Sequence, residues 1–310
     1  MKKMFGTKLA LLLVAAVLAA GALTACSSGD DGGNDGGLGG HIGENPFKGL
    51  TLVYVYKDES EEITETYSFT SDTNGVHEYK EQDNESGENY NTKFDFEYAV
   101  DSQKGMLKIK ATTFKDNTTT SARDELDNYL DNYIDKAYGE LDSETKSLIR
   151  YAHPMSFNYN YYEFSDNNTK VNIASDYYFG NLAESDAIFT LIGLTNEKAF
   201  SINHRHMHFG IEDDNKERHS YEAFPKFSDD GSFTAVIFED NEDEETDTYT
   251  YRKLGTALKG TYQIGGTGTN CTGTVTFTQL PEELQGVFKT NEPYNVAQGD
   301  YGYTTYTVKQ

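Results

Sequence analysis

Histidine recurs at alternate positions in one short segment, as His204, His206 and His208, and this spacing offers the clearest chemistry in the sequence. On a β-strand, alternate side chains share one face, and successive members of that face lie about 6.8 Å apart. Two of these imidazoles can therefore bind one metal ion, whereas the outer pair is too widely separated to do so. A third ligand has to come from a neighbouring strand.

His219 is the candidate for that third ligand. If residues 212–215 form a hairpin turn, His208 faces His219 on the adjacent strand. The sequence thus predicts a cluster of His206, His208 and His219, which would suit Zn²⁺ because a three-histidine zinc site keeps one position open. The alternative is that these histidines stand on the face of a barrel, packed against tyrosines, and bind no metal. A pairing shift of a single residue would break the cluster.

Other patterns provide no catalytic residue. Ser143 begins a Ser-x-x-Lys motif and Ser165 a Ser-Asp-Asn motif, but the Lys-Thr-Gly that completes this set in penicillin-recognising enzymes is absent. The acidic run 239–247 lacks the ligand spacing and the glycine of an EF-hand, so it is more typical of a solvated loop. We therefore expect that the protein is not an enzyme; the alternative is a hydrolytic enzyme, since an open three-histidine zinc site could activate water.

Tyrosine is the second residue type that could bind a ligand. The chain has 23 tyrosines and no tryptophan, and Tyr159 and Tyr161 share one strand face with Phe157. A tyrosine ring presents a flat apolar face and a polar tip, which suits sugars and apolar ligands. Tyr159 and Tyr161 are therefore candidate ligand-binding residues. The alternative is that they line a core, because tyrosine is also a good strand former.

The elements that must position these residues are mainly β-strands. From residue 45 onward apolar residues recur with a period of two, as in Phe94, Phe96 and Tyr98, which alternate with acidic residues. Further strands are expected at 156–164, 169–175, 198–209, 217–224, 231–238, 246–253, 259–264, 271–279 and 299–308. Strands of this length between tight polar turns predict an antiparallel barrel or sandwich.

One region breaks the strand pattern. Leu126, Leu130 and Ile134 recur at helical spacing, and a shorter helical stretch follows, with Ser143 as its expected N-cap. We expect a helical insertion around 121–152.

The first 25 residues have the features of an export signal. Lysines come first, and an apolar run of 15 residues from Leu9 to Leu23 follows, which is shorter than the roughly 20 residues of a membrane-spanning helix. The run ends in Leu-Thr-Ala-Cys, which resembles the lipobox of bacterial lipoproteins. The resemblance implies cleavage before Cys26, acyl chains on Cys26 that would incorporate palmitate, and a membrane anchor. Residues 26–44 are rich in Gly and Asp and are expected to be a disordered tether.

Residues 45–49, with the sequence Asn-Pro-Phe-Lys-Gly, begin the folded part. They resemble the opening of lipocalin-like domains in bacterial lipoproteins, particularly those of spirochaetes, and Leu50-Thr51-Leu52 stands where that family has its tryptophan. Residues 161–173 are similar to the closing hairpin of these domains. The resemblance implies a lipocalin-like β domain over 45–180 that contains the helical insertion. We expect a second β region over 181–310, packed on the first or continuous with it.

Charge excludes one class of partner. The net charge of −25 becomes −28 once the three lysines of the leader are removed, because the leader has no acidic residue. Such a chain has no electrostatic basis for binding nucleic acid. We expect a lipoprotein of the cell envelope, at the outer membrane or cell surface, that binds a small apolar or sugar ligand in a β-barrel. The alternative is a surface interaction or adhesion protein with a filled core and no small-molecule ligand.

Overall fold

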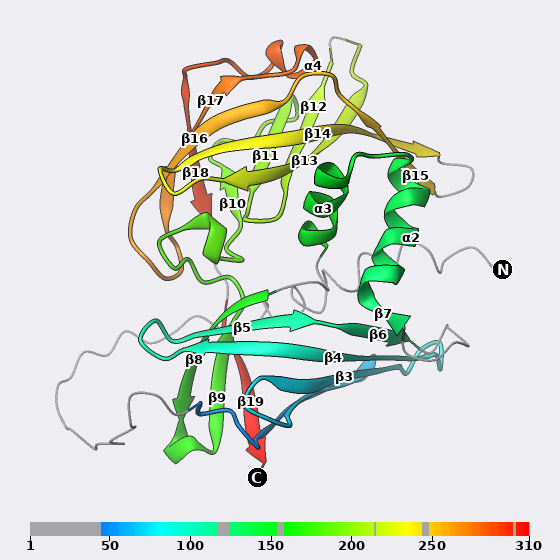
Figure 1. Ribbon diagram of the computed structural model, residues 1–310, viewed down its shortest axis with the longest axis vertical. Helices are drawn as coiled ribbons and strands as arrows, with labels where there is room; N and C mark the ends of the chain where they lie inside the picture. Colours follow the sequence, from blue (N-terminus) through cyan, green and yellow to red (C-terminus); the bar gives the residue numbers. More distant parts are fainter. Residues whose placement is uncertain are drawn as a thin grey trace.

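The computed structural model describes residues 45–116, 124–153, 158–213, 215–243, 248–299 and 302–309. It confirms the predicted fold class, which is mainly β with antiparallel barrels and a helical insertion. Two closed barrels of eight strands each lie one above the other (Figure 1). None of the helices in these residues is long and apolar enough to cross a membrane.

The first barrel is built from strands at both ends of the described chain. Its wall runs in the order β1 (Thr51–Lys57), β2 (Glu61–Phe69), β3 (Asn74–Asp83), β4 (Asn89–Asp101), β5 (Met106–Ala111), β8 (Asn158–Ser165), β9 (Lys170–Ala174) and β19 (Thr304–Lys309). β19 pairs with β1 and so closes the wall. The short strands β6 (Thr113–Asp116) and β7 (Asp124–Glu125) extend the sheet beside β4, and η2 (Asp166–Asn168) turns the chain from β8 into β9.

The second barrel follows β9 in the chain. η3 (Leu182–Glu184) leads into a wall of β10 (Phe189–Leu191), β11 (Lys198–Ile202), β12 (Met207–Glu212), β13 (Arg218–Phe227), β14 (Ser232–Asp243), β16 (Leu258–Ile264), β17 (Thr272–Gln279) and β18 (Pro293–Gln298). β18 returns to pair with β10, so this wall is also closed. β15 (Thr248–Lys253) pairs with β14 at the edge of the wall, and α4 (Glu282–Gln285) links β17 to β18.

The second barrel is thus an insertion between β9 and β19 of the first. Residues 299–308 were expected in the second β region, whereas the pairing of β19 with β1 and β9 places it in the first barrel. The physical reason is that β1 and β9 would otherwise each leave one edge unpaired, and β19 covers both edges at once.

The helical insertion joins the two barrels on one side. α2 (Leu126–Tyr138) begins against the first barrel, where Leu126 and Leu130 pack with Phe114. The C-terminal part of α2 packs against the outer face of the second barrel. The next helix, α3 (Ser143–Ala152), packs against the same face. Asp142 caps α3 by accepting a hydrogen bond from the backbone of Thr145, so the expected N-cap was one residue too late.

A buried ion pair also holds the barrels together. Arg205, in the turn after β11, donates through Nη2 to Asp186 (2.8 Å) and to Asn158 of β8 (2.7 Å). Asp186 also accepts the backbone N–H of Tyr159 at 2.6 Å. An exposed pair, Lys104 with Glu184 at 2.9 Å, adds a second tie. Charged groups that leave water remain stable only when they are paired in this way.

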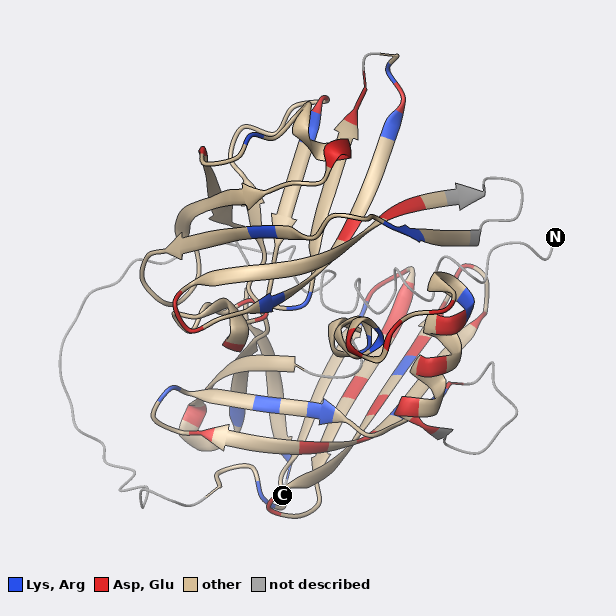
Figure 2. Ribbon diagram, turned by 45° about the horizontal axis from the view of Figure 1, so that its top comes forward, with Lys and Arg blue, Asp and Glu red and all other residues tan. Residues whose placement is uncertain are grey.

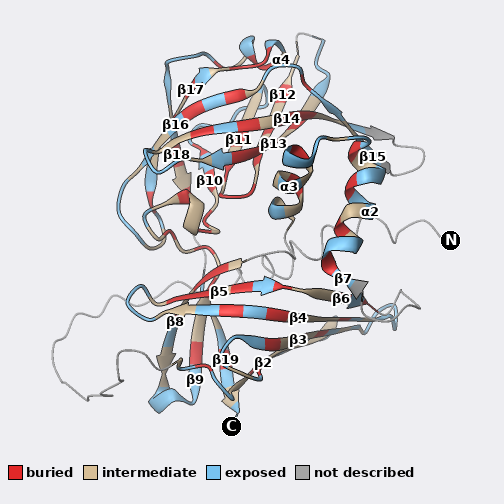
Figure 3. Ribbon diagram, in the orientation of Figure 1, coloured by how far each residue is buried: buried red, intermediate tan, exposed pale blue. Residues whose placement is uncertain are grey.

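Buried residues recur along the strands of both barrels (Figure 3), but different side chains fill the two interiors. Four phenylalanines lie together in the second barrel, each at most 2 % exposed: Phe200, Phe209, Phe277 and Phe288. In the first barrel an aromatic cluster around Phe47 occupies one end of the interior. Phe47 is fully buried and its ring centroid lies 4.8 Å from that of Tyr162, so it plugs this end of the barrel. Toward the other end, the polar side chains of Glu65 and His77 lie beside Phe94, on which the apolar cluster of Phe114, Leu126 and Leu130 packs.

Candidate functional site

The predicted three-histidine cluster does not assemble. The expected strand 198–209 is broken by a turn at 203–206, so His204 and His206 are not on a strand. His208 pairs with Glu222 across the β12–β13 hairpin, whereas His219 pairs with Ile211. The register therefore differs by three residues from the predicted one. Because three is an odd number, His219 lies on the opposite face of the sheet from His208.

Each of these histidines has its own partner. His204 is buried, lies 3.0 Å from Asp186, and has its pKa lowered to about 4 by burial. His206 Nε2 lies 3.7 Å from Glu222. His208 Nε2 lies 2.9 Å from the Ser220 hydroxyl, and burial lowers the pKa of this ring as well. These contacts place the histidines in separate polar pairs.

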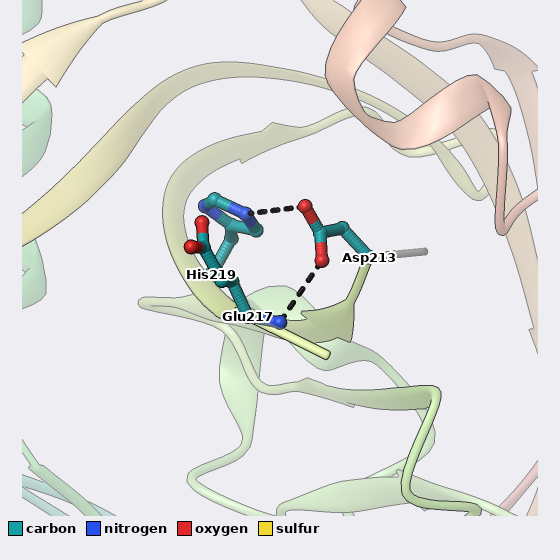
Figure 4. A group of neighbouring side chains, drawn as sticks. All are labelled: Asp213, Glu217 and His219. Carbon is teal, nitrogen blue, oxygen red and sulfur yellow. Dashed lines mark hydrogen bonds and ion pairs between the residues drawn. The ribbon is translucent and has the colours of Figure 1, made fainter. Parts of the chain in front are cut away.

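His219 instead joins two acidic residues at the turn after β12 (Figure 4). One ligand atom from each of Asp213, Glu217 and His219 lies within 4.8 Å of the others, and His219 Nε2 is 3.7 Å from Asp213. No other group of three potential metal ligands is this close within the described residues. Asp213 is already used by the turn, since it accepts the backbone N–H groups of Asn215 and Glu217.

A surface groove of about 610 Å³ borders His219 at an edge of the second barrel, and residues from both faces of the sheet, Ile211 and Ser220 among them, line it. Gly210, Ser220 and Asp240 line it, and these residues stand directly opposite one another on neighbouring strands. The groove reflects the small side chains of that row.

Tyr159 and Tyr161 both lie on the outside of the first barrel. Tyr159 is buried against Met106 and Phe179 where the barrels meet, and Tyr161 stacks on Tyr177 with ring centroids 4.3 Å apart. The interior face of β8 is the other one, which carries Tyr162. The two tyrosines thus line the junction and the outer wall. Cys26, the expected lipid-attachment residue, lies outside the described residues.

A carboxylate lies in the first barrel's interior, toward the end away from Phe47. Glu65 lies on β2 and shares its face with Tyr67 and Phe69. Its Oε1 atom is 2.9 Å from His77 Nε2 of β3, and its Oε2 atom accepts a hydrogen bond of 2.6 Å from the Tyr306 hydroxyl of β19. Tyr67 is also hydrogen-bonded to it. We call Glu65, His77, Tyr67 and Tyr306, together with the adjacent Tyr54, the interior carboxylate site.

Aromatic rings surround this carboxylate. Tyr306 lies between Tyr54 and Tyr67, with ring centroids 6.0 Å and 5.8 Å away, and Tyr67 contacts the His77 ring at 4.4 Å. His77 stacks on Phe94 at 4.3 Å. These contacts hold the hydrogen-bond donors in fixed positions toward Glu65.

The hydrogen bonds keep Glu65 ionised. Burial alone would raise its pKa, but the hydrogen bond and electrostatic attraction from His77, together with hydrogen bonds from Tyr306 and Tyr67, outweigh burial and hold the pKa below its usual value. Burial, together with the Glu65 charge, raises the pKa values of Tyr67 and Tyr306 well above the usual value, so both hydroxyls stay protonated as donors. A negative charge therefore persists inside the barrel.

This charge is in contact with space rather than sealed in protein. The Glu65 side chain is 19 % exposed, so a water-sized molecule can reach it, although His77 beside it is only 7 % exposed. Tyr54 and Tyr67 are half-buried as well. The site thus has the character of a binding pocket wall, in which a few polar groups stand among aromatic rings.

Further carboxylates lie between this site and the mouth of the barrel, which we define as the end with the β1–β2 and β3–β4 turns. Glu61 and Glu81 share the interior faces of β2 and β3 with Glu65 and Tyr79. Burial raises the pKa of Glu61, and the nearby charges of Glu81, Asp58 and Asp83 raise it further. Figure 2 shows acidic residues recurring along α2 and the adjoining strands of this barrel. The mouth therefore carries mutually repelling negative charge.

The sequence analysis missed this site, although one signal for it was present. A charged Glu65 on a face that otherwise bears Ile63, Tyr67 and Phe69 is unexpected on a core-facing strand. Comparisons with models of protein families, with curated proteins and with solved structures find no match to this chain.

Proposed function

We propose that the protein is a lipid-anchored protein of the cell envelope whose first barrel binds a small ligand at the interior carboxylate site, while the second barrel serves as a filled support. The observation that carries this proposal is the ionised Glu65, which is held by three donors inside a closed barrel and yet remains accessible to a water-sized molecule. A charge that served only stability would be better replaced by an apolar side chain.

The anchor part of the proposal is supported by the leader and Cys26. Replacing Cys26 by Ala is expected to abolish incorporation of labelled palmitate and to release the protein from the membrane fraction. Membrane retention of a normally processed Cys26→Ala protein would contradict the anchor. Cys271→Ala serves as the matched control, because Cys271 is buried in the second barrel and should leave the labelling unchanged.

The binding part is tested by screening small molecules of varied polarity for stabilisation of the folded protein. Glu65→Gln should lose the response to a stabilising ligand, because the substitution removes the charge without changing the size of the side chain. Glu97→Gln on the outer face of β4 is the control, since Glu97 is exposed and the change in net charge is identical. Equal responses of the two variants would exclude the interior carboxylate site.

The alternative is a surface interaction protein, and the filled second barrel favours it for that half of the molecule. Tyr133 on α2 is 42 % exposed and lies beside Tyr129 and Asn132 in a shallow surface pocket. A protein of this kind would show no ligand response that depends on Glu65. The binding of a macromolecular partner would then be sensitive to Tyr133→Ser.

A further inference from the structure

We infer that the ligand of the first barrel is a small organic cation, an amine whose ammonium group sits against Glu65 among the rings of Tyr54, Tyr67 and Tyr306. This inference rests on the proposed function and specifies its ligand class. It differs from the apolar or sugar ligand that the sequence suggests.

The carboxylate has hydrogen-bonding capacity left over. A carboxylate offers about four acceptor positions. His77, Tyr306 and Tyr67 occupy three of them. The side chain as a whole keeps 19 % of its surface exposed. An ammonium group supplies a donor for the remaining position together with the opposite charge, which makes the bond stronger than one between neutral groups.

The charge of Glu65 is not cancelled by its donors. Both tyrosine hydroxyls are neutral. His77 Nδ1 is buried and has no hydrogen-bond partner among the described residues. This suits a neutral ring with its proton on Nε2, because a proton on Nδ1 would be a buried donor without an acceptor. With the ring in this form, three neutral donors face one carboxylate.

The tyrosine rings would also attract a cation. An ammonium group within about 6 Å of the face of a tyrosine ring is attracted by the π-electrons. The ring centroids of Tyr54 and Tyr67 lie 6.0 Å and 5.8 Å from that of Tyr306, whose hydroxyl bonds Glu65, so aromatic rings gather around the carboxylate. A carboxylate or phosphate ligand would be repelled both by Glu65 and by these ring faces.

The route into the barrel favours a cation as well. Glu61 and Glu81 project into the interior between Glu65 and the mouth. Their mutual repulsion would be relieved by an entering positive charge, and a mouth lined with one sign of charge concentrates ligands of the opposite sign. The nearby lysines Lys57 and Lys80 pair with Glu62 and Glu78 on the outer face and leave the interior charge intact.

The experiment compares probes that differ only in charge. Two sets of probes are titrated by calorimetry into the purified protein. The first set is tyramine, 4-ethylphenol and 4-hydroxyphenylacetate, and the second is pentylamine, pentanol and pentanoate. We expect at least one amine to bind about tenfold or more tightly than its neutral and anionic counterparts. Glu65→Gln should weaken that amine about tenfold or more, in line with the loss of a charge-assisted hydrogen bond. Glu97→Gln should bind it as the wild type does.

The other outcomes separate the two ideas. If a neutral or anionic probe binds best and Glu65→Gln affects it, the cation inference is overturned while a barrel ligand site stands. If an amine binds equally well to Glu65→Gln and Glu97→Gln, the inference fails because the ammonium is elsewhere. If no probe of either set binds, both the inference and the proposed barrel site are contradicted. Circular dichroism of each variant confirms that it is folded.

Discussion

The two barrels have walls of the same strand number but interiors of opposite character. The second is packed with phenylalanine rings, and Phe277 and Phe288 in its centre are fully buried. The first is plugged by Phe47 at one end, and toward its other end Glu65, His77 and tyrosines lie beside Phe94 and its apolar cluster. A closed wall therefore does not by itself indicate a binding protein. What distinguishes the first barrel is a polar group that its interior has to accommodate.

Core truncation should show this difference most strongly. Phe277→Ala is expected to lower the free energy of unfolding by about 3–5 kcal/mol, because the surrounding rings cannot collapse into the cavity. Tyr54→Ala, beside the accessible space of the first barrel, should cost less than about 2 kcal/mol, since part of its surroundings is already open. Equilibrium denaturation in urea measures both. Equal losses would mean that the first barrel is as tightly filled as the second.

Two buried carboxylates, one inside the first barrel and one in the link between the barrels, differ in the direction of their pKa shift. Glu65 has a lowered pKa, whereas burial raises the pKa of Asp176, in the link between the barrels, to about 7. The folded protein then keeps a proton on Asp176 up to about pH 7, while the unfolded chain releases it near 3.8. The free energy of unfolding should therefore fall as the pH rises from about 4 to about 7, by up to about 1.4 kcal/mol per pH unit. This contribution is fully present below about pH 4.

Asp176→Asn removes this titration. Its stability relative to the wild type should increase from about pH 4 to about pH 7 and then stay constant. Urea denaturation of both proteins at four pH values across that window tests the prediction. Parallel stability profiles for the wild type and the variant would show that Asp176 does not titrate there.

Breaking the Arg205–Asp186 ion pair should lower the free energy of unfolding less than truncating a core residue does, but more than breaking a surface ion pair does. Arg205→Ala leaves the Asp186 carboxylate, which is 13 % exposed, without its cation. Loss of one partner of a buried pair costs about 3 kcal/mol. A double-mutant cycle with Asp186→Asn separates the pair from the contacts that each residue makes alone. A coupling energy near zero would show that the barrels are held by apolar contacts instead.

The smallest effect is expected at the exposed tie. Lys104→Met breaks the ion pair with Glu184, whose two side chains are 46 % and 45 % exposed. Such pairs contribute less than about 1 kcal/mol and are screened by salt. Thermal unfolding at low and high salt should show a small difference from the wild type that disappears in high salt. A loss comparable with that of Arg205→Ala would contradict the distinction between buried and exposed ties.

Local patterns in the sequence were sufficient to predict the fold class. Alternation in Phe94, Phe96 and Tyr98 depends only on the period of a strand, and the helical insertion follows from the spacing of Leu126, Leu130 and Ile134. The histidine cluster was wrong because it depended on the register of one hairpin, and the turn at 213–217 shifted that register by an odd number of residues.

The interior carboxylate site could not be assembled from local patterns. Glu65 is 12 residues from His77 but 241 residues from Tyr306. The second contact exists only because β19 returns to the first barrel, and the sequence around β19 contains nothing that says which barrel it will join. Tyr159 and Tyr161 were placed on the right strand, but the face that looks inward carries Tyr162 instead.

The return of β19 also sets an order of assembly during synthesis. The ribosome makes every strand of the second barrel before it makes β19, so that barrel can close while β1 and β9 still have free edges. The barrel that begins first in the chain is therefore the last to be completed, and its closure waits for a contact across more than 200 residues. During this interval the unfinished barrel exposes two strand edges to other chains. The first barrel is thus completed only after every strand of the second has been made.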